Sequence, residues 1–208
     1  MVIYPMKIKL ETMLDMQDDM NSRVNADWRQ AKSEWYRAIW TECAEMLEHY
    51  GWKWWKHQQP DLDQVRLEMV DIFHFAMSDY LLREADSKAL VERIINELSQ
   101  PGNETDIPCA IEAMAQSTIA NQSMHFSTFA NVMQLIDMDF DQLYRLYVGK
   151  NVLNFFRQDH GYKEGSYIKI WNGLEDNEHL TELLNGLDSE SADFKDNVYQ
   201  GLQCRYPS

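Results

Sequence analysis

The sequence predicts an all-α protein, and three observations support this prediction. Glycines number 8 and prolines 5 among 208 residues, which is few for a chain of this length. Runs that alternate Val, Ile or Thr with polar residues are missing, so a sheet is not expected. Apolar residues recur instead at approximately helical spacing along much of the chain.

Four helices are expected in the first half of the chain. Apolar spacing places them at residues 8–24, 26–50, 61–85 and 88–98. Gly51 is the expected stop of the second helix, because glycine readily takes the left-handed conformation that closes many helices. Asp61 directly follows Pro60 and is the expected N-cap of the third helix.

Five further helices are expected in the second half. They are predicted at residues 107–119, 126–138, 140–159, 180–187 and 192–202. The segment between the third and the fourth of these is polar and rich in turn residues. The loop QPGNETD at 100–106 is the best candidate for a subdomain boundary. We therefore expect one domain over residues 1–208, with any internal break near 100–106.

Composition narrows the setting and the partners. A formal net charge of -15 would repel phosphate backbones and anionic lipids, so we expect neither a nucleic-acid surface nor a membrane surface. The longest apolar run is a few residues, well short of the roughly 20 that span a bilayer. The three cysteines are widely spaced and form neither a disulfide framework nor a zinc knuckle, which indicates a reducing, cytoplasmic location.

Two acidic pairs at helical spacing stand out between residues 34 and 81. Glu42 and Glu45 lie three residues apart in the second predicted helix. Glu68 and Asp71 have the same spacing in the third, so each pair projects from one face of its helix. The second pair is the more informative, because it stands within LEMVDIF, where a buried acid needs a partner.

Four converging carboxylates predict a site for hard cations. Without a cation they would repel one another and stay partly protonated. Oxygen ligands favour Mg²⁺, which takes one or two carboxylates per ion together with phosphates and water. We therefore expect two or more Mg²⁺ at Glu42, Glu45, Glu68 and Asp71. Such a centre supports phosphoryl displacement, because the metals neutralise the phosphates and lower the pKa of an attacking water.

Other interpretations of the acids stay open. An E-x-x-E pair is common on solvated helix faces, and a non-catalytic helical scaffold with a structural metal ion would also carry such acids. His74 follows Asp71 at the spacing D-x-x-H, which raises the alternative of a di-iron carboxylate bundle. That alternative needs two such motifs, and the other match, Asp176 to His179, lies beside a glycine-containing turn. No Walker A, G-x-G-x-x-G, H-E-x-x-H or G-x-S-x-G pattern occurs.

A cationic stripe and a pair of amides lie outside the acidic region. Lys150, Asn154 and Arg157 share one face of the predicted helix 140–159 and suit either a phosphate clamp or pairing with surface acids. Gln17 and Asn21 share a face of the first helix, and their amides offer donor and acceptor groups to a base edge.

The aromatic run WKWW at 52–55 has two interpretations. Tryptophans in such a run more often anchor a hydrophobic core than stack on a base. Composition alone therefore favours a place for them in the core.

Several motifs occur in a fixed order along the chain. They are QDDMN at 17–21, ECAE at 42–45, GWKWWK at 51–56, EMVDIFHF at 68–75, KNVLNFFRQDHGYKEG at 150–165 and EDN at 175–177. Together they resemble the dimeric, all-α dUTP diphosphatases (dUTPases), members of the helical nucleoside triphosphate pyrophosphohydrolases. The resemblance covers the N-terminal 85 residues and about Tyr144 to Asn177. It implies a helical bundle of that type with a smaller, mobile helical part that closes over the nucleotide.

The resemblance also implies an activity and a set of site residues. The activity is hydrolysis of dUTP to dUMP and pyrophosphate, and of dUDP to dUMP and phosphate, with Mg²⁺ at the four acids and Glu42 or Glu45 as the base for the attacking water. Uracil and deoxyribose contacts are implied for Gln17, Asn21, Trp54, His74, Phe75 and Asn177. Phosphate contacts are implied for Lys150, Asn154, Arg157, Lys163 and Lys169. Members of the family are homodimers, which implies a homodimer here.

The departures from the family pattern are small. Phe73 stands where the family often has Trp, which is a conservative aromatic change. A related branch also accepts dCTP, so the resemblance leaves open a helical dCTP/dUTP or broader nucleoside triphosphate pyrophosphohydrolase.

Overall fold

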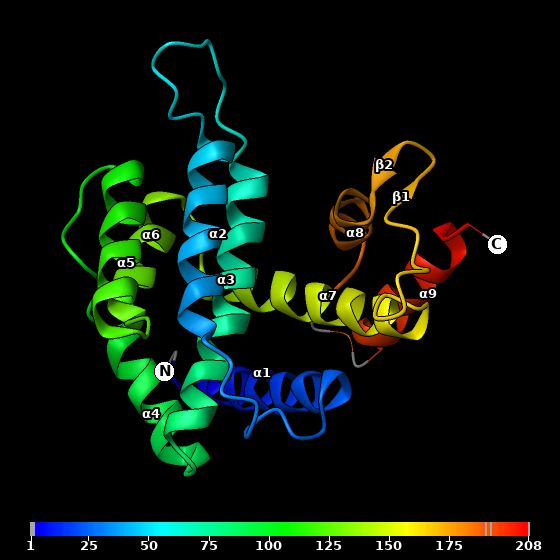
Figure 1. Ribbon diagram of the computed structural model, residues 1–208, viewed down its shortest axis with the longest axis horizontal. Helices are drawn as coiled ribbons and strands as arrows, with labels where there is room; N and C mark the ends of the chain where they lie inside the picture. Colours follow the sequence, from blue (N-terminus) through cyan, green and yellow to red (C-terminus); the bar gives the residue numbers. More distant parts are fainter. Residues whose placement is uncertain (1–2, 190, 192, 208) are drawn as a thin grey trace. The chain divides into compact units, whose positions relative to one another are not determined.

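The computed structural model describes residues 3–189, 191 and 193–207, and it confirms the prediction of an all-α fold (Figure 1). Helices make up most of these residues, and a single two-stranded hairpin is the only sheet in the described part of the chain. None of the described helices combines the length and the apolar character that a bilayer crossing requires.

The chain divides into two compact units, Met1–Leu143 and Tyr144–Ser208, and the division lies inside a helix rather than at the loop 100–106. That loop belongs to the first unit, where the amide of Asn131 fixes it. The side chain accepts a hydrogen bond from the Glu104 N–H at 2.9 Å and donates one to the Glu104 carbonyl at 3.1 Å. The Gly102 N–H donates to the Ser127 carbonyl at 3.0 Å. These bonds attach the loop to α6 within the first unit.

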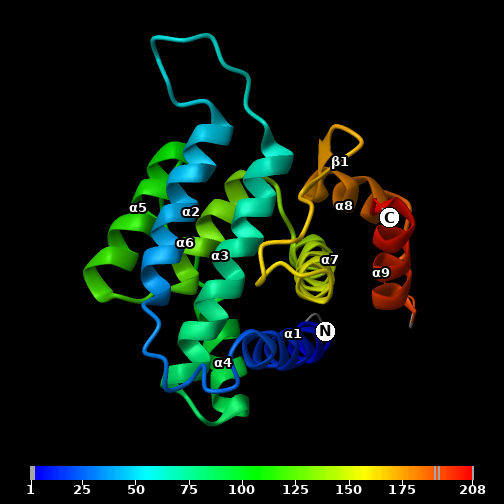
Figure 2. The ribbon, with the colours of Figure 1, turned by 45° about the vertical axis from the view of Figure 1, so that its right-hand side comes forward.

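The first unit is a helical bundle. Its helices are α1 (Ile3–Val24), α2 (Trp35–Tyr50), α3 (Leu62–Arg83), α4 (Ser87–Leu98), α5 (Ile107–Asn121), α6 (Phe126–Leu135) and the first turn of α7 (Phe140–Asp159). The helices α2 and α3 lie side by side in opposite directions, with α5 against α2 and α1 against α3 (Figures 1 and 2). Aromatic rings fill the space under α3, where Phe73 packs at 5.3 Å from Phe126 and 5.4 Å from Phe129, measured between ring centroids.

Both predicted ends of the α2–α3 hairpin are confirmed. Gly51 closes α2 in the left-handed conformation, with φ of 85°, and its N–H donates to the Leu47 carbonyl. A Cβ atom at this position would meet the Cβ of Gln58 at 2.8 Å, so glycine is needed for space as well. Asp61 caps α3 by accepting a hydrogen bond from the Gln64 N–H. The caps fix where the two helices begin and end, and hence the register of the acids they carry.

The predicted start of the second helix is wrong. Residues 26–32 form turns, and α2 begins at Trp35 rather than at residue 26. The Asn25 side chain accepts a hydrogen bond from the Asp27 N–H, and Lys32 takes a φ of 52°. A left-handed residue cannot continue a right-handed helix, so the helix must restart after it.

The second unit contains the rest of α7, the hairpin and two short helices. The strands are β1 (Ile170–Trp171) and β2 (Leu174–Glu175), and the helices are α8 (Asp176–Asn185) and α9 (Phe194–Arg205). The hairpin was not expected, although its Asn172–Gly173 turn has the dipeptide and the two positive φ angles typical of such connections. A capping box between Glu175 and Glu178 starts α8 earlier than predicted. Ala192, the predicted first residue of the last helix, lies outside the described residues.

Candidate active site

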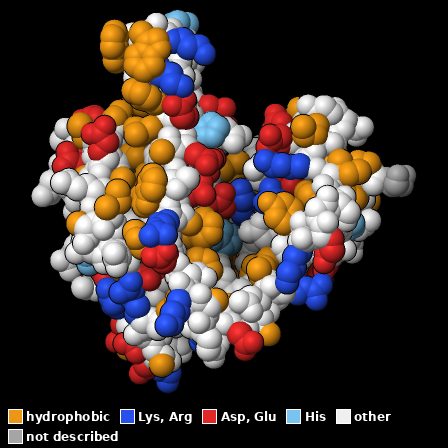
Figure 3. Space-filling view, in the orientation of Figure 1, with side chains coloured by type: hydrophobic (Ala, Val, Ile, Leu, Met, Phe, Trp, Pro, Cys, Tyr) orange, Lys and Arg blue, Asp and Glu red, His pale blue; other side chains and the backbone are white. Residues whose placement is uncertain are grey.

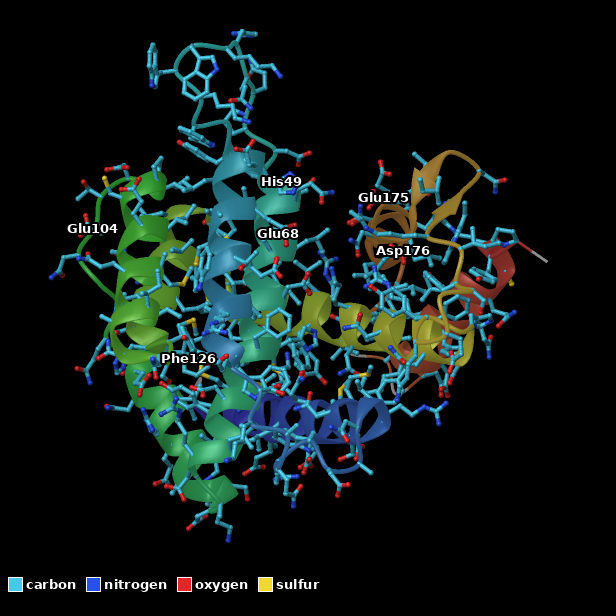
Figure 4. The ribbon with its side chains drawn as sticks, viewed as in Figure 1. His49, Glu68, Glu104, Phe126, Glu175 and Asp176 are labelled. Carbon is cyan, nitrogen blue, oxygen red and sulfur yellow. The ribbon has the colours of Figure 1, made fainter. Side chains whose placement is uncertain are left out.

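Three of the four predicted acids meet on the face of the α2–α3 hairpin. Carboxylate oxygens of Glu42, from α2, and of Glu68 and Asp71, from α3, all lie within 4.8 Å of one another. Figure 3 shows acidic side chains gathered on this face, and Figure 4 shows Glu68 just below His49 of the facing helix. The packing of two antiparallel helices therefore joins Glu42 to acids that lie 26 and 29 residues further along the sequence.

Repulsion between the three carboxylates makes their full ionisation unfavourable in free energy when no cation is bound. Burial, together with the charges of Asp71, Glu68 and Glu45, raises the pKa of Glu42 from 4.5 to about 8. All three acids of the group are half-buried, so water screens their charges poorly. A cation at the shared position would relieve the repulsion and favour the fully ionised form.

The donor atoms at this position fit a hard cation. They are carboxylate oxygens, the ligands that Mg²⁺ and Ca²⁺ prefer over nitrogen or sulfur. Cys43 follows Glu42 in sequence but is buried, and burial raises the pKa of its thiol to about 12, so it stays protonated. His49 Nε2 lies 3.3 Å from Glu68 Oε1 and is half-exposed at the edge of the group.

Glu45, the fourth predicted ligand, lies outside the group of three. Its side chain is exposed on α2, one turn from Glu42. Its charge nevertheless contributes to the raised pKa of Glu42, so it belongs to the same electrostatic environment.

The di-iron alternative finds no support in the histidines of the two D-x-x-H motifs. His74 is not part of the acidic group, and its Nδ1 lies 2.6 Å from Gln17 Oε1. His179 Nε2 lies 2.9 Å from the Trp171 carbonyl oxygen, in the second unit. Neither ring joins the three acids, whereas a di-iron centre requires histidine ligands beside its carboxylates.

A buried polar cluster joins α1 to α3. It consists of Gln17 and Asn21 from α1 and His74 and Ser78 from α3, all of them buried. The Gln17 Nε2 donates to Asn21 Oδ1 at 3.0 Å and to Ser78 Oγ at 3.0 Å, while Asn21 Nδ2 donates to Ser78 Oγ at 2.9 Å. Three of the predicted uracil-contacting residues are therefore brought together, and their polar groups have a fixed arrangement.

The predicted aromatic contacts lie in two different environments. Phe75 is stacked on Trp35, with ring centroids 6.2 Å apart. Trp54 lies in the α2–α3 connection, where hydrophobic and basic side chains gather at the tip of the hairpin (Figure 3), and is 88% exposed. The expectation that the WKWW tryptophans anchor the core is thus wrong. Trp54 and its neighbours contact mainly one another, at 5.3 Å between the rings of Trp54 and Trp55.

The cationic stripe of α7 is organised by the start of α8 within the second unit. Lys150 is buried, and its Nζ donates to Asn177 Oδ1 at 3.1 Å. Arg157 donates from Nε and Nη2 to the two oxygens of Asp176 at 2.8 and 2.9 Å, and from Nη1 to Asn154 Oδ1 at 3.2 Å. The four predicted residues of this unit that lie on α7 and α8 are thus held in two hydrogen-bonded sets, Lys150 with Asn177 and Arg157 with Asn154 and Asp176.

Asp176 is completely buried, and Arg157 compensates its charge. Burial alone would raise the pKa of Asp176, but the hydrogen bonds and the charge of Arg157 outweigh it, so the pKa lies below its ordinary value. The Tyr167 hydroxyl also donates to Asp176 Oδ2 at 2.9 Å. A bidentate pair of this kind fixes the plane of the guanidinium.

The two remaining predicted cations are exposed. Lys169 pairs with Glu175 at 3.1 Å, and both side chains are about half exposed. Lys163 is exposed in the turn after α7.

Sequence reasoning missed three residues that organise these groups. Ser78 lies one turn after His74, and that spacing was a signal for its place beside Gln17 and Asn21. Trp35 gave no signal, and Asp176 was noted only in the D-x-x-H match and the EDN motif, because their contacts with Phe75 and Arg157 depend on long-range packing.

Comparison with known protein families gives a match. A sequence model of the family described as dUTPase matches residues 9–162, which is more than half of the 208 residues. The match contains the acidic group, the polar cluster and Arg157, and it ends before Lys163, Lys169 and Asn177. No curated protein matches the chain.

Proposed function

Since the chain belongs to the dUTPase family and is a dUTP diphosphatase, we propose that it hydrolyses dUTP with Mg²⁺ held by the acidic group of the first unit. The observation that carries this proposal is the meeting of Glu42, Glu68 and Asp71, whose oxygens lie within 4.8 Å of one another. The number of ions proposed is two or more, because a single Mg²⁺ usually takes only one or two carboxylates.

The acids would hold Mg²⁺ at the position where the triphosphate binds. When bound, Mg²⁺ supplies neutralisation of the phosphates and a lowered pKa of water. Glu68 and Asp71 come from a capped, buried helix, so their positions change little on binding. Glu42 approaches from α2 and completes the oxygen set from the other side.

Glu45 is proposed as a further ligand or as the base that takes the proton of the attacking water, a role that Glu42 could fill instead. An exposed carboxylate beside the group can accept a proton and pass it to solvent. Glu45→Gln should therefore lower kcat by about a thousandfold, within the range of general-base catalysis, with a small effect on KM. Glu48→Gln, one turn further along α2 and exposed, is the matched control.

The polar cluster and its neighbours are proposed to contact uracil and deoxyribose. Gln17 and Asn21 provide amides and His74 provides an imidazole as hydrogen-bonding groups for the base. Hydrogen bonds to the edge of the base are what distinguish uracil from other bases. A second, apolar part of the contact is proposed for Phe75 and Trp54, which provide aromatic faces for a base or sugar. Asn177 is proposed as a further base contact.

The cationic group of the second unit is proposed to bind the phosphates. Lys150, Asn154 and Arg157 form its fixed part, and Lys163 and Lys169 add exposed positive charge. Lys150→Ala should raise KM for dUTP about tenfold, equivalent to about 1.4 kcal/mol of lost binding. Lys195→Ala, a change to an exposed lysine of α9, should leave KM unchanged.

Several finer properties are proposed with the reaction. They are hydrolysis of dUDP to dUMP and phosphate, a homodimeric state, a cytoplasmic location, and the absence of a nucleic-acid surface, which the net charge of -15 supports. Hydrolysis of dUTP removes that nucleotide from the polymerase pool and supplies dUMP for thymidylate synthesis.

A nucleotide panel tests the proposal. Phosphate release, coupled to an inorganic pyrophosphatase for the triphosphates, should be found with dUTP and dUDP, should require Mg²⁺, and should be weaker with dCTP, dTTP and dATP. Comparable rates with dUTP and dCTP would instead favour the broader pyrophosphohydrolase. If Mg²⁺ raised the melting temperature while nucleotide raised it no further and no release occurred, the acids would serve a structural ion.

A further inference from the structure

Ser78 occupies the centre of the buried polar cluster and has no exposed surface. Its hydroxyl accepts one hydrogen bond from Gln17 Nε2 and another from Asn21 Nδ2, at 3.0 and 2.9 Å. It donates to the backbone carbonyl of His74 at 3.0 Å, one turn earlier on α3. A single serine therefore contacts both amides of α1 and the backbone of the histidine that completes the cluster.

The single proton of a serine hydroxyl sets the orientation of both amides. Because that proton goes to the His74 carbonyl, the oxygen of Ser78 can only accept from its other neighbours. The nitrogen atoms of Gln17 and Asn21 must then face it. An amide turned around would place a second acceptor against the same oxygen, with no proton between them.

The orientation continues to the edges of the cluster. With its nitrogen directed to Ser78 and to Asn21 Oδ1, the amide of Gln17 directs its oxygen to His74 Nδ1, at 2.6 Å. Asn21 in turn uses its oxygen as an acceptor from Gln17. Every amide in the cluster thus has one orientation, and reversing one would break at least two hydrogen bonds.

Fixed amides can distinguish uracil from cytosine. Uracil offers a donor at N3 and an acceptor at position 4, whereas cytosine offers an acceptor at N3 and an amino donor at position 4. An amide that can rotate by 180° exchanges its donor for its acceptor and can accommodate either base. A site whose amides cannot rotate rejects the wrong base, because a buried polar group would remain unpaired.

We propose that Ser78 is the residue that determines the preference for uracil over cytosine, by fixing the orientation of Gln17 and Asn21. It is a positioning residue, since it acts through the two amides and need not touch the nucleotide. This inference rests on the proposed role of those amides in base binding.

The test is the ratio of kcat/KM for dUTP to kcat/KM for dCTP, measured with Mg²⁺. In Ser78→Ala this ratio should fall at least tenfold. Ser78→Thr keeps the hydroxyl and should retain most of the ratio. Ser78→Cys keeps the volume but is a weak acceptor, so it should lower the ratio even if the alanine variant unfolds.

Thr118→Ala is the matched control. Thr118 is also buried in the first unit, and its Oγ1 has no hydrogen-bond partner among the described residues. Its removal should change stability without changing the ratio.

The failure of this inference can be distinguished from the failure of the proposed function. An unchanged dUTP to dCTP ratio in a folded Ser78→Ala or Ser78→Cys variant that still hydrolyses dUTP would overturn the inference and leave the proposed function intact. A wild-type protein that shows no Mg²⁺-dependent hydrolysis of dUTP would overturn the proposed function itself.

Discussion

The two units handle buried negative charge in opposite ways. In the first unit, Glu42 lies against Glu68 and Asp71, and this crowding raises its pKa to about 8. In the second unit, Asp176 is more deeply buried, yet its pKa is lowered, because Arg157 donates two hydrogen bonds to it. Burial alone therefore does not decide whether the pKa of a carboxylate is raised or lowered.

The difference separates a structural acid from a candidate ligand. Asp176 has the charge, the hydrogen bonds and the geometry that a buried carboxylate needs within its own unit. The acids of the first unit repel one another, and a cation would remove the repulsion. Acids that the fold places together despite this cost are candidates for binding.

The largest expected effect is on activity, from loss of the acidic group. Glu68→Gln should lower kcat/KM for dUTP by about a thousandfold, since a metal ion contributes several kcal/mol to such a reaction. Asp63→Asn, on the exposed face of the same helix, should have little effect. Chelation with EDTA should abolish activity and added Mg²⁺ should restore it. A Glu68→Gln variant with wild-type activity would contradict the assignment of the first unit's acids as metal ligands.

The next effect is on stability, from loss of the compensated pair. Asp176→Asn should destabilise the second unit by about 3 kcal/mol at neutral pH, because it leaves the Arg157 charge poorly compensated. Hydrogen exchange of the α8 amides and chemical denaturation would measure this loss. Glu182→Gln, a change to an exposed acid of the same helix that pairs with Arg205, should change stability by less than about 0.5 kcal/mol.

The loss caused by Asp176→Asn should depend on pH. The folded pKa of Asp176 lies below its unfolded value of about 3.9, so the pair stabilises the fold fully above that value. Its contribution disappears as the pH falls from there through the folded pKa. Wild type and variant should therefore converge in acid, and a constant difference down to the lowest pH would contradict the assignment.

A smaller effect should change sign with metal. Without divalent cations, Glu42→Gln should be more stable than wild type by about 1 kcal/mol, or roughly 2–4 °C in melting temperature, because it relieves repulsion. With Mg²⁺ the order should reverse, because the variant lacks a ligand. Melting curves with EDTA and with Mg²⁺ would show the crossover. A variant that stays more stable in both conditions would argue against metal binding at this group.

The smallest effect on stability is expected in the exposed connection between α2 and α3. Trp54→Ala should change the unfolding free energy by less than about 0.5 kcal/mol, since the side chain is 88% exposed. If Trp54 contacts the nucleotide, KM for dUTP should rise about fivefold, equivalent to about 1 kcal/mol. Trp55→Ala in the same connection is the control, and equal effects of both changes would remove a specific role for Trp54.

Prediction from the sequence succeeded where the signal was local. The stop at Gly51 and the cap at Asp61 were identified because each depends on a few neighbouring residues. The start of α2 was misplaced because Lys32 takes a left-handed conformation that no nearby glycine announces. The hairpin at Asn172–Gly173 had a recognisable turn, but two-residue strands are too short to show alternation.

The sequence by itself determined the helices, the family and the spacing of each acidic pair, since all of these are encoded in short stretches of chain. Only the tertiary structure decided that Glu42 meets Glu68 and Asp71 while Glu45 stays exposed. It alone assigned Asp176 to Arg157 and Ser78 to the two amides of α1. Helical periodicity specifies which side chains share a face, whereas contacts between faces depend on the packing of segments far apart in the chain.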